Sequence, residues 1–186
     1  MLLFEWKNKR VNDNQDGIAI ENGYVRCPED YVAKAVFRNF PKLEFNNIRL
    51  INCVFVNCDY IQIDDGLLMD CSFNRINSLF ACRSDIVHCK FEHLKCDSDF
   101  LITMEDCEMT QCLFRDVELR NDAYLCEGVD KVEVKNCVFR DCSTTRGDRK
   151  MFHGIRLGKG LFKRKAEIEI LDERTCKGLH QVKHIG

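Results

Sequence analysis

Between residues 48 and 142, apolar and polar positions alternate in short stretches that break off at regular places. The breaks surround a Cys-any-Phe unit that occurs five times, with its cysteine at Cys53, Cys71, Cys89, Cys112 and Cys137. An apolar residue stands three places before each of these cysteines, and a polar residue stands one place before. With 13 Cys and 13 Phe in 186 residues, about one such unit is expected by chance, so the five copies indicate an internal repeat.

The apolar positions of each copy fall at −3, 0, +2 and +5, counted from the cysteine. Alternate residues of a strand lie on the same face, so the change of parity on either side of the Cys-any-Phe unit predicts a corner where one extra residue bends the chain. Polar residues, chiefly Asn and Asp, stand at these places, and Asn and Asp tolerate left-handed backbone geometry. The predicted corners are Asn52, Asp70 and Asn136 before the cysteine, and Asn57, Arg75, His93, Asp116 and Asp141 after the phenylalanine.

The spacing of the copies indicates short strands wound into coils. Two equal steps lead from Cys53 to Cys71 and on to Cys89, and two longer steps follow, to Cys112 and to Cys137. All four steps are shorter than helix-pair or propeller repeats. Coils stacked at the ordinary strand spacing would place like residues above one another, so cysteines and phenylalanines are predicted to form interior columns. The two longer steps predict loops that bulge near residues 95–106 and 118–130.

Two stretches carry a resemblance to a known family. Residues 48–58 (IRLINCVFVNC) and 132–142 (VEVKNCVFRDC) resemble coils of the right-handed parallel β-helix proteins of the pectate-lyase-like superfamily. The resemblance covers about half of the chain and implies an all-β, right-handed parallel β-helix of about five to seven coils. A second resemblance is to the pentapeptide-repeat proteins, because three pairs of cysteines are five residues apart. Three of the four steps between successive repeat cysteines are not multiples of five, and the five-residue spacing does not persist around a whole coil, so this interpretation ranks second.

The flanking segments are predicted to close the coil stack. Residues 17–26 alternate around Asn22-Gly23, which favours a hairpin. Residues 27–37 carry Pro and acids at their start, followed by spaced apolar residues, which favours a short helix. We therefore expect an N-terminal cap of hairpin plus helix over residues 1–44, coils over 45–142, and a last coil or C-terminal cap and tail over 143–186.

Charge and cysteine content restrict the setting of the protein. The net charge of −2 and pI near 6.2 provide no overall attraction to nucleic acid. The first residues lack the order of a secretory signal, and no apolar stretch has the length of a membrane span. Thirteen cysteines are an odd number without a pairing framework, so we expect reduced, buried thiols in a cytoplasmic protein.

An acidic cluster near the first predicted loop is a candidate catalytic site. Its members are Asp97, Asp99, Glu105 and Asp106. The resemblance to the pectate-lyase-like superfamily implies carboxylates on an outer wall that act as metal ligands or as acid and base. Two carboxylates at a suitable separation can also hydrolyse a glycosidic bond. The competing interpretation is a solvated loop that keeps an apolar stack soluble.

Metal sites are weaker candidates. Cys176, His180 and His184 are four residues apart and would share one face of a helix, although Gly178 disfavours a helix there. His88, Cys89, His93 and Cys96 have zinc-ligand chemistry, but the repeat places the histidines outward at corners and Cys89 inside. No cofactor motif is present.

The hypothesis that these patterns favour is a non-catalytic solenoid that binds a protein partner or associates with itself. One alternative is a carbohydrate-acting enzyme, or its degenerate relative, that uses the acidic loop. Another is a pentapeptide-like mimic of nucleic acid, for which the family resemblance implies a strongly negative surface that the near-neutral charge does not provide.

Overall fold

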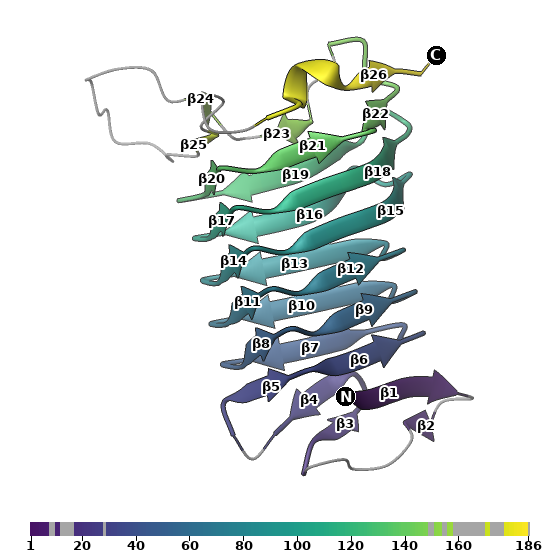
Figure 1. Ribbon diagram of the computed structural model, residues 1–186, viewed down its shortest axis with the longest axis vertical. Helices are drawn as coiled ribbons and strands as arrows, with labels where there is room; N and C mark the ends of the chain where they lie inside the picture. The colour runs from purple at the N-terminus through teal and green to yellow at the C-terminus, as the bar shows by residue number, and fades with distance from the viewer. Residues whose placement is uncertain are drawn as a thin grey trace.

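The computed structural model is an elongated β-solenoid in which the chain winds upward through three long sheets (Figure 1). It describes residues 1–7, 10–11, 17–27, 29–148, 151–153, 156–157, 170–171 and 177–185. Within these residues there is no α-helix, and six successive turns contribute strands to all three sheets. The predicted all-β parallel solenoid is therefore confirmed.

Each of the six turns contributes at least one strand to each sheet. The first sheet has the order β2 (Arg10–Val11), β1 (Leu2–Lys7), β6 (Ala35–Arg38), β9 (Val54–Val56), β12 (Ser72–Asn74), β15 (Lys90–Cys96), β18 (Leu113–Leu119), β22 (Ser143–Thr144) and β26 (Lys183–His184), and β21 (Val138–Arg140) also pairs with β18. The second sheet has the order β23 (Phe152–His153), β19 (Tyr124–Val129), β16 (Phe100–Glu105), β13 (Ser78–Cys82), β10 (Tyr60–Asp64), β7 (Leu43–Asn46), β4 (Tyr24–Arg26) and β3 (Ala19–Glu21). The third sheet has the order β24 (Arg156–Leu157), β25 (Ile170–Leu171), β20 (Glu133–Lys135), β17 (Glu108–Thr110), β14 (Asp85–Val87), β11 (Leu67–Met69), β8 (Arg49–Ile51) and β5 (Tyr31–Ala33).

A column of phenylalanines runs through the interior behind the first sheet. Parallel pairing aligns Phe55 with Phe73 and Phe73 with Phe91, so successive rings lie directly above one another. Ring centroids in the column are 4.8 to 5.3 Å apart and the rings are nearly parallel. All seven members are at most 1% exposed: Phe4, Phe37, Phe55, Phe73, Phe91, Phe114 and Phe139. The predicted phenylalanine column is confirmed.

The cysteines form the predicted interior column beside the phenylalanines. The five repeat cysteines are buried, and their thiols donate to main-chain carbonyls. The Sγ of Cys71, for example, lies 3.3 Å from the carbonyl oxygen of Leu50 in the turn below. Burial raises the pKa of Cys58, Cys107 and Cys142 to about 11, so these thiols stay protonated and behave as small apolar groups.

The corners of the repeat are made by residues with left-handed backbone geometry. All eight predicted corner residues have φ between 52° and 55°. A third set of corners, between the second and third sheets, repeats the arrangement at Asn47, Asp65, Arg83, Asp106 and Asp130. Asn and Asp predominate because they adopt this geometry at lower cost than β-branched residues.

The two longer steps widen the solenoid and form only short turns beyond it. β15 and β18 continue past their corners and pair again at Leu94 with Val117 and at Cys96 with Leu119. Cys96 and Leu119 are buried, as are Leu101 and Leu125 on the opposite sheet. The prediction of bulging loops over 95–106 and 118–130 is therefore wrong for most of these residues, because they extend the strands and the core.

The N-terminal segment differs from the prediction in one respect. The hairpin is present, since β3 and β4 pair antiparallel around Asn22 and Gly23, both with positive φ. The predicted helix over 27–37 is wrong, because β5 and β6 occupy this stretch and pair with β8 and β9. Lys34 has φ of 54°, which makes it a further corner of the repeat. The capping role of residues 1–44 remains a prediction.

The C-terminal residues lie against the last turn. A short 3-10 helix, η1 (Leu179–Gln181), is followed by β26, which pairs with β22. The main chain at Gly178 passes so close to the last turn that a Cβ there would overlap the carbonyl oxygen of Phe139. Among the described residues, no helix has the length and apolarity needed to cross a membrane.

Candidate binding surface on the second sheet

The outer face of the second sheet carries most of the aromatic residues that the core does not use, and Tyr31 on the third sheet is an exception. Strand β10 alternates, so that the inward residues Ile61 and Ile63 leave their neighbours facing solvent. β13, β16 and β19 also alternate, except where two consecutive residues are buried. Four half-buried rings result, one from each strand: Tyr60, Phe80, Phe100 and Tyr124. Phe100 and Tyr124 stack with centroids 5.9 Å apart.

The same face is acidic. Strands β7, β10, β13, β16 and β19 contain four acidic residues and neither lysine nor arginine: Glu44, Asp64, Glu105 and Glu127. Each of the four acids is half-buried and directly follows a buried residue, so it lies on the outward side of its strand. We call these four acids, together with Tyr60, Phe80, Phe100 and Tyr124, the acidic–aromatic wall.

The centre of the wall contains two carboxylates that form no salt bridge within the described residues, although the charge of Asp64, after the hydrogen bonds and charge of Asp65, helps to raise the pKa of Arg83. Asp64 accepts a hydrogen bond from the Nε2 of Gln62 at 2.7 Å, and the Oε1 of Gln62 accepts from the Tyr60 hydroxyl at 3.0 Å. The Glu105 carboxylate makes no hydrogen bond or ion pair within the described part of the chain. The nearest corner arginine, Arg83, is held by both oxygens of Asp65 at 2.6 and 2.8 Å.

Basic side chains from outside these strands lie over the tyrosines at both ends of the wall. At the lower end, the Nζ of Lys42 lies 5.9 Å from the Tyr60 ring centroid and 5.7 Å from that of Tyr24, and it also pairs with Glu44. At the upper end, the Cζ of Arg146 lies 4.0 Å from the Tyr124 centroid. The wall therefore already attracts cations to its rings.

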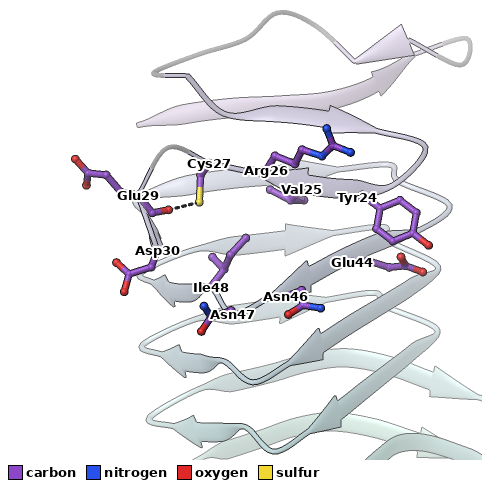
Figure 2. Close-up of a pocket in the computed structure, with 10 residues that line it drawn as sticks. All are labelled: Tyr24, Val25, Arg26, Cys27, Glu29, Asp30, Glu44, Asn46, Asn47 and Ile48. Carbon is purple, nitrogen blue, oxygen red and sulfur yellow. Dashed lines mark hydrogen bonds between the residues drawn. The ribbon is translucent and has the colours of Figure 1, made fainter.

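A shallow, open hollow of about 460 Å³ lies at the N-terminal end of the wall, where the N-terminal hairpin meets the corner at Asn47 (Figure 2). Its lining includes Tyr24, Arg26, Cys27 and Glu44. The Cys27 thiol donates to the carbonyl oxygen of Glu29, and burial, followed by the charge of Asp30, raises the pKa of this thiol. The hollow thus presents a protonated cysteine with lowered reactivity.

The four acidic residues of the predicted loop do not form one site. Asp97 and Asp99 are exposed in the turn before β16, whereas Glu105 and Asp106 stand at its other end. The six-residue strand between them separates the two pairs by about 20 Å, beyond the distance at which two carboxylates share a glycosidic bond. Only Asp97 and Asp99 share one turn, and this turn leads into Phe100, which stacks on Tyr124. The main-chain N–H of Tyr124 donates to the carbonyl oxygen of Asp99 at 2.8 Å.

The metal candidates are also not assembled. Cys176 lies outside the described residues. His180 lies in η1, which ends at Gln181, and His184 lies in β26 with its Nε2 3.1 Å from the carbonyl oxygen of Thr145, so the two do not share a helical face. As predicted, Cys89 is buried while His88 and His93 are exposed at corners. The described residues contain no group of three or more side chains placed to hold a metal ion.

Sequence reasoning missed the acidic–aromatic wall, although the alternation in residues 60–64 and 78–82 was a signal that could have found it. Comparison with known proteins adds no relative: no protein-family model matches the chain, and no curated protein matches its sequence.

Proposed function

We propose that this protein is a non-catalytic β-solenoid that binds another protein through the acidic–aromatic wall. The observation that carries the proposal is the concentration of outward aromatic rings on one of three walls. Outward aromatics are enriched at protein interfaces because they bury a large area at low entropic cost. A rigid solenoid presents such rings on a flat, preformed face.

The ends of the stack are less suited to binding than the acidic–aromatic wall. β1 and β26 lie outside β6 and β22 in the first sheet, and two-residue strands, β2 and β26, form its outermost edges. Short edge strands disfavour pairing with the edge of another molecule. Self-association through the ends is therefore the less favoured form of the interaction hypothesis.

The test is to capture binding proteins from the native cell with wild type, with a variant of the wall and with a control variant, and to compare which partners each retains. A triple variant, Tyr60→Ser, Phe80→Ser and Phe100→Ser, is expected to lose the partner retained by wild type. The matched control changes outward residues of the first sheet, Val54→Ser, Leu113→Ser and Val138→Ser, and is expected to retain it. Equal retention by both variants would refute the wall as the binding surface. Light scattering after size exclusion measures self-association in the same samples.

A carbohydrate-acting protein is the second candidate, favoured by the exposed Asp97 and Asp99 beside Phe100 and Tyr124. Aromatic rings beside paired carboxylates suit a sugar ligand or Ca²⁺. This candidate predicts that an oligosaccharide or Ca²⁺ raises the melting temperature of wild type but not of Asp97→Ala or Asp99→Ala. An unchanged melting curve across a glycan and metal panel would exclude it.

A reducing, cytoplasmic compartment is part of the proposal. The twelve cysteines among the described residues are all free thiols, and eleven of them are buried. The interior thiols donate to main-chain carbonyls and fill the core in their reduced form, so the fold does not depend on disulfide formation.

A further inference from the structure

The first and second sheets of the solenoid differ in charge. The strands β7, β10, β13, β16 and β19 of the second sheet carry four acids and no Lys or Arg. The strands of the first sheet in the same turns and the next, β6 to β21, carry five Lys or Arg against three acids: Arg38, Lys90, Lys95, Arg115 and Arg140 against Glu92, Asp116 and Glu118. The second sheet is thus the face that repels phosphate and attracts cations.

The unpaired charge of this face lies around an aromatic ring. Strand register places Asp64 beside Cys82 on one side and Glu105 beside Cys82 on the other. Phe80 stands two residues before Cys82, so the two share one side of β13, although Cys82 itself is buried. From strand geometry, Asp64 and Glu105 are each diagonal to Phe80, with residue-to-residue separations of about 7 to 8 Å. A cation lying on Phe80 would therefore have a carboxylate within reach on either side.

The chain itself demonstrates that rings of this sheet accept cations. Arg146 lies over Tyr124 at 4.0 Å while its guanidinium pairs with Asp148 at 3.1 Å, so ring and carboxylate act on one side chain. Lys42 combines Tyr60 with Glu44 in the same way. Phe80, between these two ends, has no Lys or Arg of the described residues over its ring. The nearest guanidinium, that of Arg83, is held by Asp65 and by the Sγ of Cys82 at 3.0 Å.

We infer that the acidic–aromatic wall binds an extended, arginine-rich segment of the protein partner, with a guanidinium on Phe80 between Asp64 and Glu105. This inference rests on the proposed function and identifies the chemistry of the partner. Arginine fits better than lysine because its planar guanidinium stacks on a ring while forming two parallel hydrogen bonds with a carboxylate. Several arginines along one chain would engage successive strands, which are about 4.8 Å apart.

The test measures binding of fluorescein-labelled (Gly-Arg)₅, (Gly-Lys)₅ and (Gly-Glu)₅ peptides to the full chain by fluorescence anisotropy, with reducing agent present. We expect saturable binding of the arginine peptide, weaker binding of the lysine peptide and none of the glutamate peptide. The variant Asp64→Asn with Glu105→Gln should weaken arginine-peptide binding at least about tenfold, which corresponds to 1.4 kcal/mol.

Matched controls separate a specific site from general attraction to an acidic protein. Asp85→Asn with Glu108→Gln removes the same charge from adjacent strands of the third sheet and should leave the affinity within about twofold. Phe80→Leu should weaken binding while Phe80→Trp preserves it, since only the latter keeps a ring. Unchanged far-UV spectra and melting curves verify that the variants fold.

Three outcomes would overturn the inference: no binding of (Gly-Arg)₅, equal weakening by the wall variant and its third-sheet control, or binding of an oligosaccharide that depends on Phe80 in place of the peptide. If a native partner is captured through the wall but its binding segment is not basic, the inference fails while the proposed function stands. If no partner depends on the wall, the proposed function itself fails.

Discussion

Replacing Phe91 by Ala removes the ring at the middle of the phenylalanine column. Phe91 is 0% exposed and stacks on Phe73 and Phe114, with both centroids 4.8 Å away. Loss of a buried Phe side chain costs about 3–5 kcal/mol, and each aromatic pair contributes about 0.5–1.5 kcal/mol beyond burial. The main-chain ladders of β12, β15 and β18 hold the strand spacing, so the gap cannot close. We therefore expect a loss near the upper end, about 5 kcal/mol.

Urea unfolding followed by circular dichroism measures this loss directly, and a thermal scan should show a fall in Tm of about 10–20 °C for a chain of this size. The control is Lys90→Ala, an exposed residue next to Phe91 in β15, which should stay within about 0.5 kcal/mol of wild type. Phe91→Leu, which refills part of the gap, should fall between the two. Equal free energies of unfolding for Phe91→Ala and Lys90→Ala would refute the interior position of the column.

Three further predictions concern the C-terminal contact, a cysteine and a corner. Gly178→Ala should destabilise the protein by more than about 1 kcal/mol and speed proteolysis after residue 177. The reason is that Gly178 has φ of 89° and that the new Cβ would meet a main-chain carbonyl of β21. The control Gly147→Ala, whose new Cβ has no atom within 4 Å, should change neither the stability nor the rate of proteolysis. Among the described cysteines, Cys27 should react first with a thiol reagent in the native state, since the others are buried. Mass mapping of the labelled peptides after partial reaction measures the order of labelling, and faster labelling of a buried thiol would contradict the prediction. The hydrogen bonds from Arg83 lower the pKa of Asp65, so the pair stabilises the fold above the unfolded pKa of about 3.9 and this contribution is lost as pH falls through the lower folded value. Urea midpoints between pH 5 and 2.5 should therefore fall more steeply for wild type than for Asp65→Asn, and parallel slopes would count against the pair.

The parts of the fold that the sequence predicted are those in which a residue type has a single structural role at a fixed position of the repeat. Cys and Phe at fixed spacing determined the interior columns, and Asn or Asp at a change of parity determined the corners, because few other residues adopt φ near +54° cheaply. The helix over 27–37 was mispredicted for a related reason. Val32, Ala35, Phe37 and Phe40 occupy the −3, 0, +2 and +5 positions of a further repeat in which Ala replaces Cys, and all four are buried.

The candidate surface could be predicted less well than the fold. Tyr60 and Phe80 belong to the strands between the Cys-any-Phe units, where the step length varies and the alignment on cysteine gives no register. Their position on one wall depends on pairing across turns, such as Gln62 with Phe80, that only the structure provides. The acidic cluster failed as a single site because neighbours in sequence lie at opposite ends of β16.

The turns of this solenoid are unequal, and this decides where the molecule could gain or lose a module. The turns that begin at Cys53 and Cys71 are equal in length, so excising residues 71–88 would seat Phe91 on Phe55 with every corner conserved. The longer turns that begin at Cys89 and Cys112 supply the second apolar layer of Cys96 and Leu119. Removal of either turn would leave the apolar layer of the other without its packing partner. The fold should thus tolerate duplication or deletion of a whole turn among the short turns that begin at Cys53 and Cys71, but not among the longer turns that begin at Cys89 and Cys112.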